Sequence, residues 1–190
     1  MSACSDAFIV VTGGPGAGKT TLIAALAGRG LATMPEAGRA VIQAQSAAGG
    51  NGLPWADRAL FAELMLTADL KSHRDAQERQ GPVIFDRGIP DIAGYLGLCG
   101  LPVPERLCRA MGRCRYARKV LLAPPWQAIF GQDAERRQDF DEAERTCRMV
   151  ANAYAEQGYE LVELPCASVE ARVAFVMGHL GLAPPMQRGE

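Results

Sequence analysis

The residues whose spacing most clearly indicates chemistry lie in one short segment near the start of the chain. Residues 13–20 read Gly-Gly-Pro-Gly-Ala-Gly-Lys-Thr and fit the pattern G-x-x-x-x-G-K-[ST]. The glycines let successive backbone N–H groups turn toward an anion, and the N-terminus of a following helix adds positive charge. Lys19 can reach the β- and γ-phosphates of a nucleoside triphosphate, and the Thr20 hydroxyl can ligate Mg²⁺. The expected phosphate-binding residues are Gly14, Pro15, Gly16, Ala17, Gly18, Lys19, Thr20 and Thr21.

Other motifs narrow the class of nucleotide-binding protein. The N-K-x-D motif of GTPases is absent, and residues 91–94 fit D-x-x-G only formally. The apolar segment Val83-Ile-Phe-Asp86 is followed by Arg87, where a motor-type ATPase would normally carry a catalytic glutamate. Asp-Arg at the end of such a strand resembles the arrangement of small P-loop kinases. This resemblance implies ATP with Mg²⁺ as the cofactors of a kinase-like protein.

Asp86 and Arg87 are candidate site residues because ligands of open α/β sheets bind beyond the carboxyl ends of the strands. Asp86 could ligate Mg²⁺ or orient an acceptor hydroxyl, and its structural alternative is to cap the next helix. Arg87 could contact an acceptor phosphate or hold Asp86 in place.

The elements that must position these residues alternate between short apolar strands and helices. Strands are expected at residues 7–12, 31–34, 83–85, 119–123 and 159–164. Helices are expected at residues 20–27, 55–80, 90–98, 105–116 and 168–180, with 124–158 mostly helical. Ser168 is a good N-cap for the last helix, and the Gly-rich residues 46–54 are expected to form a loop. This alternation predicts an α/β fold with a parallel sheet.

Length and composition limit the number of domains and the kinds of partner and location that the chain can have. The 190 residues carry a net charge of -1 and are 48% hydrophobic, which predicts one globular domain over residues 1–190. The charge makes nucleic acid an unlikely partner, and no apolar run is long enough to span a membrane. Residues 1–6 lack a basic segment, so we expect no signal peptide. The six cysteines show no C-x-x-C spacing and predict reduced, mostly buried thiols of a cytoplasmic protein.

Five segments together resemble a known family. These are residues 13–21, 35–39, 85–91, 124–126 and 133–137. They resemble the "predicted ATPase" family of AAA-like P-loop domains, which is similar to thymidylate kinase and to the deoxynucleoside and nicotinamide-riboside kinases. The resemblance runs from about Phe8 to Leu180. It implies a three-layer α/β/α P-loop NTPase fold, a five-stranded parallel sheet of order 2-3-1-4-5 and a helical lid at about 124–148.

Glu36 matches in position the general-base glutamate of deoxynucleoside kinases. The surrounding residues differ, since this chain has Glu36-Ala-Gly-Arg39 where those kinases have Glu-Pro-Val. The resemblance therefore implies that Glu36 binds substrate or takes its proton, without implying a nucleoside. The structural alternative is an ion pair between Glu36 and Arg39.

Arg136 and Arg137 lie where nucleotide kinases carry a lid. A lid guanidinium supplied on closure would stabilise the charge that spreads over the transferred phosphoryl oxygens. The alternative is a solvated helix face, because Arg137 and Asp141, and likewise Asp141 and Arg145, are spaced i,i+4. The basic segment 106–119 is also expected to be a solvated face.

These features predict phosphoryl transfer from ATP to a small-molecule acceptor, such as a nucleoside, a nucleotide or a related hydroxyl compound. Lys19, Asp86, Glu36, Arg136 and Arg137 are the catalytic candidates. The candidates for acceptor binding are Glu36, Arg39, Trp55, which could stack on a ring or simply begin a helix, and Arg87. Two alternatives remain open, namely a simple ATPase and an ATP-dependent binding module. The chain is expected to be a monomer or a homodimer.

Overall fold

The fold is built on a five-stranded parallel sheet. A computed structural model describes residues 6–130 and 139–182. The strands are β1 (Phe8–Gly13), β2 (Ala32–Met34), β3 (Val83–Asp86), β4 (Lys119–Ala123) and β5 (Glu160–Glu163). Their order is β2-β3-β1-β4-β5 and every neighbouring pair is parallel. The predicted strand order is confirmed, and the central strands β1 and β3 are buried along their whole length, as the apolar sequence requires.

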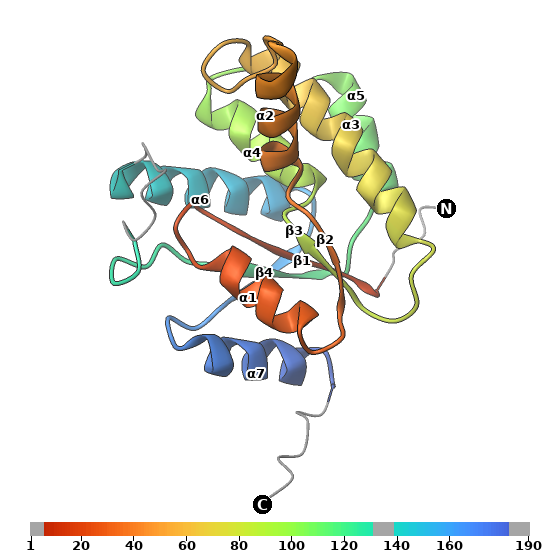
Figure 1. Cartoon of the computed structure of the whole chain (residues 1–190), viewed down its shortest axis with the longest axis vertical. Coiled ribbons are helices and arrows are strands. Elements are labelled where there is room, and N and C mark those ends of the chain that lie inside the picture. The colour runs from red at the N-terminus through yellow and green to blue at the C-terminus, as the bar shows by residue number, and fades with distance from the viewer. Residues whose placement is uncertain (1–5, 131–138, 183–190) are drawn as a thin grey trace, which may run out of the picture.

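Seven helices are seen in the described residues, in one layer on each face of the sheet (Figure 1). Their bounds are α1 (Lys19–Ala27), α2 (Ala37–Ala48), α3 (Arg58–Ala76), α4 (Ile89–Leu98), α5 (Glu105–Arg113), α6 (Phe140–Glu156) and α7 (Val169–His179). Helices α1 and α7 cover one face, where Ile9 and Val11 of β1 point. Helices α2 to α6 cover the other, where Phe8 and Val10 point. Alternate side chains of β1 thus pack into two separate hydrophobic cores, one on each face of the sheet.

Several helix ends differ from those predicted. Helix α3 begins at Arg58 rather than Trp55, because the side chain of Asp57 caps it by accepting a hydrogen bond of 2.9 Å from the Leu60 amide. Residues 37–48 form a helix that the sequence analysis left unassigned, and it takes the first part of the predicted 46–54 loop. Helix α5 stops at Arg113. The predicted cap is confirmed at Ser168, whose hydroxyl accepts from the Ala171 amide.

The segment that follows β4 is less helical than predicted. Residues 124–130 form an extended stretch and a turn, and α6 begins only at Phe140. Pro124 and Pro125 lack amide hydrogens and so disfavour a helix directly after the strand. Part of the predicted lid, residues 131–138, lies outside the described part of the chain.

The cysteines are less buried than predicted. Of the five in the described ranges, Cys147 is buried, Cys99 and Cys114 are half-buried, and Cys108 and Cys166 are exposed. All five are free thiols, as the missing C-x-x-C spacing indicated. Within residues 6–130 and 139–182, no helix has both the length and the apolar character needed to cross a bilayer.

Candidate active site

The phosphate-binding loop connects the end of β1 to the start of α1. Gly16 and Gly18 have φ angles of +76° and +72°, a region that suits glycine. A Cβ added at Gly13 would lie 2.2 Å from the Ala123 carbonyl oxygen, and one at Gly14 would lie 2.4 Å from that of Ala143. The loop therefore needs glycine both for its conformation and for its close approach to neighbouring backbone.

Lys19 lies inside this loop. Its side chain is buried, and its ammonium donates to the carbonyl oxygens of Gly13 at 3.1 Å and Gly14 at 2.7 Å. Burial and the nearby Arg87 guanidinium lower the pKa of Lys19 to about 7. Thr20 and Thr21 are exposed at the start of α1. A buried ammonium held only by carbonyl oxygens, with open hydroxyls beside it, fits a triphosphate and its Mg²⁺.

Asp86 lies at the end of β3, directly beside β1. It is 8% exposed, and its Oδ1 has no hydrogen-bond partner in the described residues. Burial and the neighbouring Glu36 carboxylate raise the pKa of Asp86. The capping alternative is wrong, because the N-cap of α4 is Gly88 and the acidic side chain at that helix end is Asp91. A buried, unpartnered carboxylate oxygen at this edge fits Mg²⁺, a water on Mg²⁺, or an acceptor hydroxyl.

Arg87 connects the phosphate-binding loop to the neighbouring strand ends. Its φ of +70° is uncommon for a residue with a side chain. Its Nε donates to Glu36 at 3.2 Å, and its Nη1 donates to Asp91 at 2.9 Å and to the Gly13 carbonyl at 3.0 Å. No hydrogen bond or ion pair joins Arg87 to Asp86 in the described residues, so the prediction that Arg87 holds Asp86 directly is wrong. Arg87 instead positions Glu36 against the loop.

Asp91 is a positioning residue that the sequence analysis missed. Besides Arg87, it accepts hydrogen bonds from the Thr12 hydroxyl at 2.5 Å, the Tyr154 hydroxyl at 2.7 Å and the Gly88 amide at 3.0 Å. Its four donors come from β1, from the turn after β3 and from α6. The available signal was the i,i+4 spacing of Arg87 and Asp91 at the start of a helix.

Glu36 lies at the N-terminal end of α2, next to the end of β2. Its two oxygens face two arginines, Arg87 at 3.2 Å and Arg39 at 3.9 Å. Burial would raise the pKa of Glu36, but the Arg87 and Lys19 charges outweigh it and hold the pKa below its ordinary value. The predicted ion pair with Arg39 is therefore present, and the shorter ion pair with Arg87 was not predicted.

A cavity of about 790 Å³ opens beside this cluster, and we call it the acceptor cavity. Its walls come from the phosphate-binding loop and from helices α2, α3, α4 and α6. The predicted residues that line it are Pro15, Glu36, Arg39 and Arg87. Trp55 is 68% exposed and does not line the cavity, so the prediction that it stacks on a bound ring has no geometric support.

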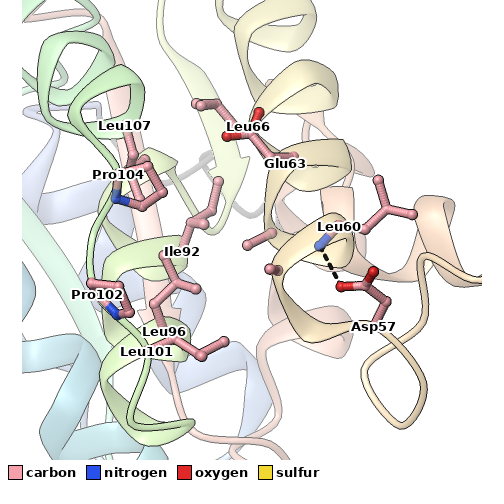
Figure 2. A pocket seen from close by; sticks show the side chains of 12 residues that line it. Asp57, Leu60, Glu63, Leu66, Ile92, Leu96, Leu101, Pro102, Pro104 and Leu107 are labelled. Carbon is pink, nitrogen blue, oxygen red and sulfur yellow. Dashed lines mark hydrogen bonds between the residues drawn. The ribbon is translucent and has the colours of Figure 1, made fainter.

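A second cavity of about 370 Å³ lies between α3, α4 and the segment before α5 (Figure 2). Figure 2 shows Leu60 and Leu66 of α3 on one side and Ile92 and Leu96 of α4 on the other. None of the predicted site residues lines it. It therefore lacks the candidate residues Pro15, Glu36, Arg39 and Arg87 that line the acceptor cavity.

The remaining observations concern an unpredicted arginine, the predicted lid arginines and the possible metal ligands. Arg172 of α7, which the sequence analysis did not identify, is 3% exposed and donates to the Ala17 carbonyl at 3.0 Å from behind the phosphate-binding loop. Arg136 and Arg137 lie outside the described residues. Within the described ranges, no group of three His, Cys, Asp or Glu side chains could by itself hold a metal ion. A Mg²⁺ ion here would thus depend on phosphate oxygens together with Thr20 and Asp86.

Comparison with known proteins agrees with this architecture. A family model described as an AAA domain matches residues 8–172. No curated protein matches the chain by sequence. Deoxyadenosine kinase from M. mycoides, with products dCMP and a flexible dCDP bound, is similar with a TM-score of 0.64 and 15% identity over 92% of this chain and 98% of that chain.

Two other solved structures share the fold. NadR protein in complex with NR gives a TM-score of 0.69 at 18% identity, over 96% of this chain and 52% of that chain. The M. mycoides deoxyadenosine kinase with bound dATP gives 0.54 at 14% identity, over 92% of this chain and 99% of that chain. At these identities the similarity establishes a common fold.

Proposed function

This chain belongs to the AAA domain family, and we propose that it is an ATP-dependent kinase that phosphorylates a hydroxyl group of a small molecule. One observation carries the proposal. The Asp86 carboxylate, with its unpartnered Oδ1, interacts electrostatically with Lys19 of the phosphate-binding loop and with Glu36, and the Glu36–Arg87 pair lines a cavity of about 790 Å³. A simple ATPase needs room only for water, whereas this cavity has the size of a small-molecule site.

The chain's own groups would hold ATP and Mg²⁺ at the loop. Backbone N–H groups of Gly14 and of residues 16–19 and the N-terminus of α1 would bind the phosphates, and the Lys19 ammonium would exchange its two carbonyl partners for phosphate oxygens. Thr20 and Asp86 would hold Mg²⁺, directly or through water. When bound, ATP supplies the phosphoryl group and Mg²⁺ neutralises part of the phosphate charge.

Glu36 and Asp86 are the groups that can orient the acceptor hydroxyl and take its proton. Such a base must lie within about 3 Å of the proton it removes. Burial raises the pKa of Asp86, which strengthens it as a base in the free protein, whereas Arg87 keeps Glu36 ionised and fixed in orientation. We propose that Arg87 holds Glu36 toward the acceptor while the helices around the cavity exclude bulk water.

The acceptor class we favour is a nucleoside, a nucleotide or a related hydroxyl compound. Two proteins of the same fold hold ligands of this kind, since deoxyadenosine kinase is seen with dCMP or dATP and NadR with NR. The free thiols of the five described cysteines agree with a reducing cytoplasm.

A second candidate is an ATP-dependent binding module with little turnover. The ion pairs of Glu36 with Arg87 and Arg39 favour it, because a paired, ionised glutamate with a lowered pKa is a weak base. In that case ATP and the cavity ligand would bind without efficient transfer between them.

ADP formation distinguishes the candidates. The protein is given ATP and Mg²⁺ with and without each member of a panel of nucleosides, nucleotides and sugars, and the phosphorylated product is identified by mass spectrometry. A kinase shows ADP formation that one acceptor stimulates, with one phosphorylated product per ADP. ADP formation that no acceptor changes indicates an ATPase. Tight ATP binding with negligible ADP indicates the binding module.

A further inference from the structure

Asp69 is a buried carboxylate that the proposed transfer chemistry does not use. It lies on α3, is 7% exposed and lines the acceptor cavity. Within the described part of the chain it forms no ion pair and no hydrogen bond. A buried carboxyl group is normally partnered, because removing it from water without compensation is costly. The missing partner at Asp69 therefore points to something that enters the cavity.

The charges around Asp69 favour a cation as that partner. The charged residues that line the cavity are four acids and four arginines, namely Glu36, Asp69, Asp91, Glu142, Arg39, Arg58, Arg87 and Arg145. The charges that act on Asp69 itself are those of Asp91, Glu36 and Arg87, and Arg87 already pairs with the other two. Burial, followed by the negative charges of Asp91 and Glu36, raises the pKa of Asp69 to about 8. Neither Arg87 nor any other described cation pairs with Asp69.

Two aromatic residues of the same wall would also suit a cation. Phe61 of α3 and Tyr95 of α4 line the cavity with their ring centroids 5.4 Å apart in an edge-on arrangement. Aromatic faces attract ammonium and other cationic groups within about 6 Å.

We propose that the acceptor is a cationic hydroxyl compound, a protonated amine or a permanently charged nitrogen compound, whose positive charge binds to Asp69. The inference rests on the proposed function, since it names the class of molecule that the acceptor cavity takes. The hydroxyl of such a compound would lie toward Glu36 and Asp86, and its charge would lie toward α3. Asp69 would then determine specificity without taking part in phosphoryl transfer.

The test compares binding of cationic compounds with that of matched neutral ones. Suitable pairs are choline and 3,3-dimethylbutan-1-ol, glucosamine and glucose, and nicotinamide riboside and its uncharged dihydro form. Dissociation constants are measured by calorimetry with a non-hydrolysable ATP analogue present, so that turnover is not required. The variants are Asp69→Asn, which keeps the shape and removes the charge, and Asp75→Asn as the control. Asp75 is on the same helix, half-exposed and paired with Lys71 outside the cavity.

We expect wild type to bind the cationic member of at least one pair at least about tenfold more tightly than its neutral counterpart. The same preference is expected in Asp75→Asn and a ratio near one in Asp69→Asn. Equal binding within every pair, no binding of any cation, or a preference that survives in Asp69→Asn would overturn the inference. A different result would contradict the proposed function but not this inference. In that case the protein would prefer cations in a way that depends on Asp69, but it would form no ADP from ATP.

Discussion

The two sides of the site recognise their ligands by different means. The phosphate side consists mainly of backbone within one run of eight residues, residues 13–20. The acceptor side consists of side chains on four helices, from Glu36 at the start of α2 to Arg145 in α6. Backbone amides bind any phosphate in the same way, so the phosphate side leaves a local sequence pattern. The acceptor side depends on contacts between distant residues, and its specificity is encoded only in the folded chain.

The largest expected effect is on the phosphate side. Lys19→Ala should lower kcat by about 10²–10³-fold or more, because it removes the cation nearest the transferred charge, and it should weaken ATP binding. The helix should survive, since alanine is a good helix former. Steady-state kinetics and ATP titration check this, with Lys71→Ala as the control because Lys71 is an exposed lysine of α3. A folded Lys19→Ala variant with wild-type kcat would show that Lys19 does not bind the transferred phosphate.

Asp86 interacts electrostatically with Lys19 on the phosphate side and with Glu36 on the acceptor side. Its substitution therefore tests both sides. Asp86→Asn keeps the size of the side chain and removes its charge. We expect kcat to fall by about 10²-fold and the Mg²⁺ concentration for half-maximal rate to rise, with ATP affinity changed by no more than about threefold. Rates measured across a Mg²⁺ series test this. Wild-type rates at every Mg²⁺ concentration would show that Asp86 contributes neither as metal ligand nor as base.

Arg87→Lys should affect the acceptor side more than the phosphate side. Lysine keeps the charge but cannot present the planar fork that reaches Glu36, Asp91 and the Gly13 carbonyl together. The acceptor KM should rise about tenfold, which corresponds to about 1.4 kcal/mol, while the ATP Kd changes little. Arg106→Lys, on the exposed face of α5, is the control. An unchanged acceptor KM would mean that Arg87 does not position Glu36 for the acceptor.

The smallest effect is a gain in stability at Asp69. Its pKa is about 8 in the folded chain, raised by burial and by Asp91 and Glu36 against the opposing charge of Arg87, and near 3.8 when unfolded. Between these values the unfolded state binds fewer protons than the folded state, so wild-type stability falls as pH rises from about 4 to 8. Asp69→Asn lacks this loss, so its stability relative to wild type should rise by at most about 1.4 kcal/mol for each pH unit in this range.

Urea denaturation at pH 5, 6, 7 and 8 measures that gain. The advantage of Asp69→Asn over wild type should widen with pH and level off above about pH 8, whereas Asp75→Asn should show no such widening. Parallel pH profiles for wild type and Asp69→Asn would show that folding does not raise the pKa of Asp69. Greater stability together with lost cation binding would identify Asp69 as a residue kept for recognition.

Local sequence patterns were sufficient for the strands, the phosphate-binding loop and the position of Asp86 at a strand end, as in the apolar run of β1 and the glycine spacing of residues 13–20. The strand order and the choice of Glu36 came from the family resemblance. The roles of Asp91 and Asp69 were not predictable in this way. Asp91 gains its role from donors as distant as Thr12 and Tyr154, and Asp69 gains its role from the walls that bury it. For the same reason Arg172 became recognisable only when α7 was seen packed behind the loop.

The hydrogen bonds of Arg87 connect the two sides of the candidate site. Its Nη1 bonds to the Gly13 carbonyl, which also accepts from Lys19, and its Nε bonds to Glu36 in the acceptor cavity. If Lys19 left that carbonyl for a phosphate, the hydrogen bonding of Arg87 would change, and with it the orientation of Glu36. We therefore expect the ATP and acceptor affinities to be linked. Linkage is reciprocal, so ATP must change acceptor affinity by the same factor by which the acceptor changes ATP affinity.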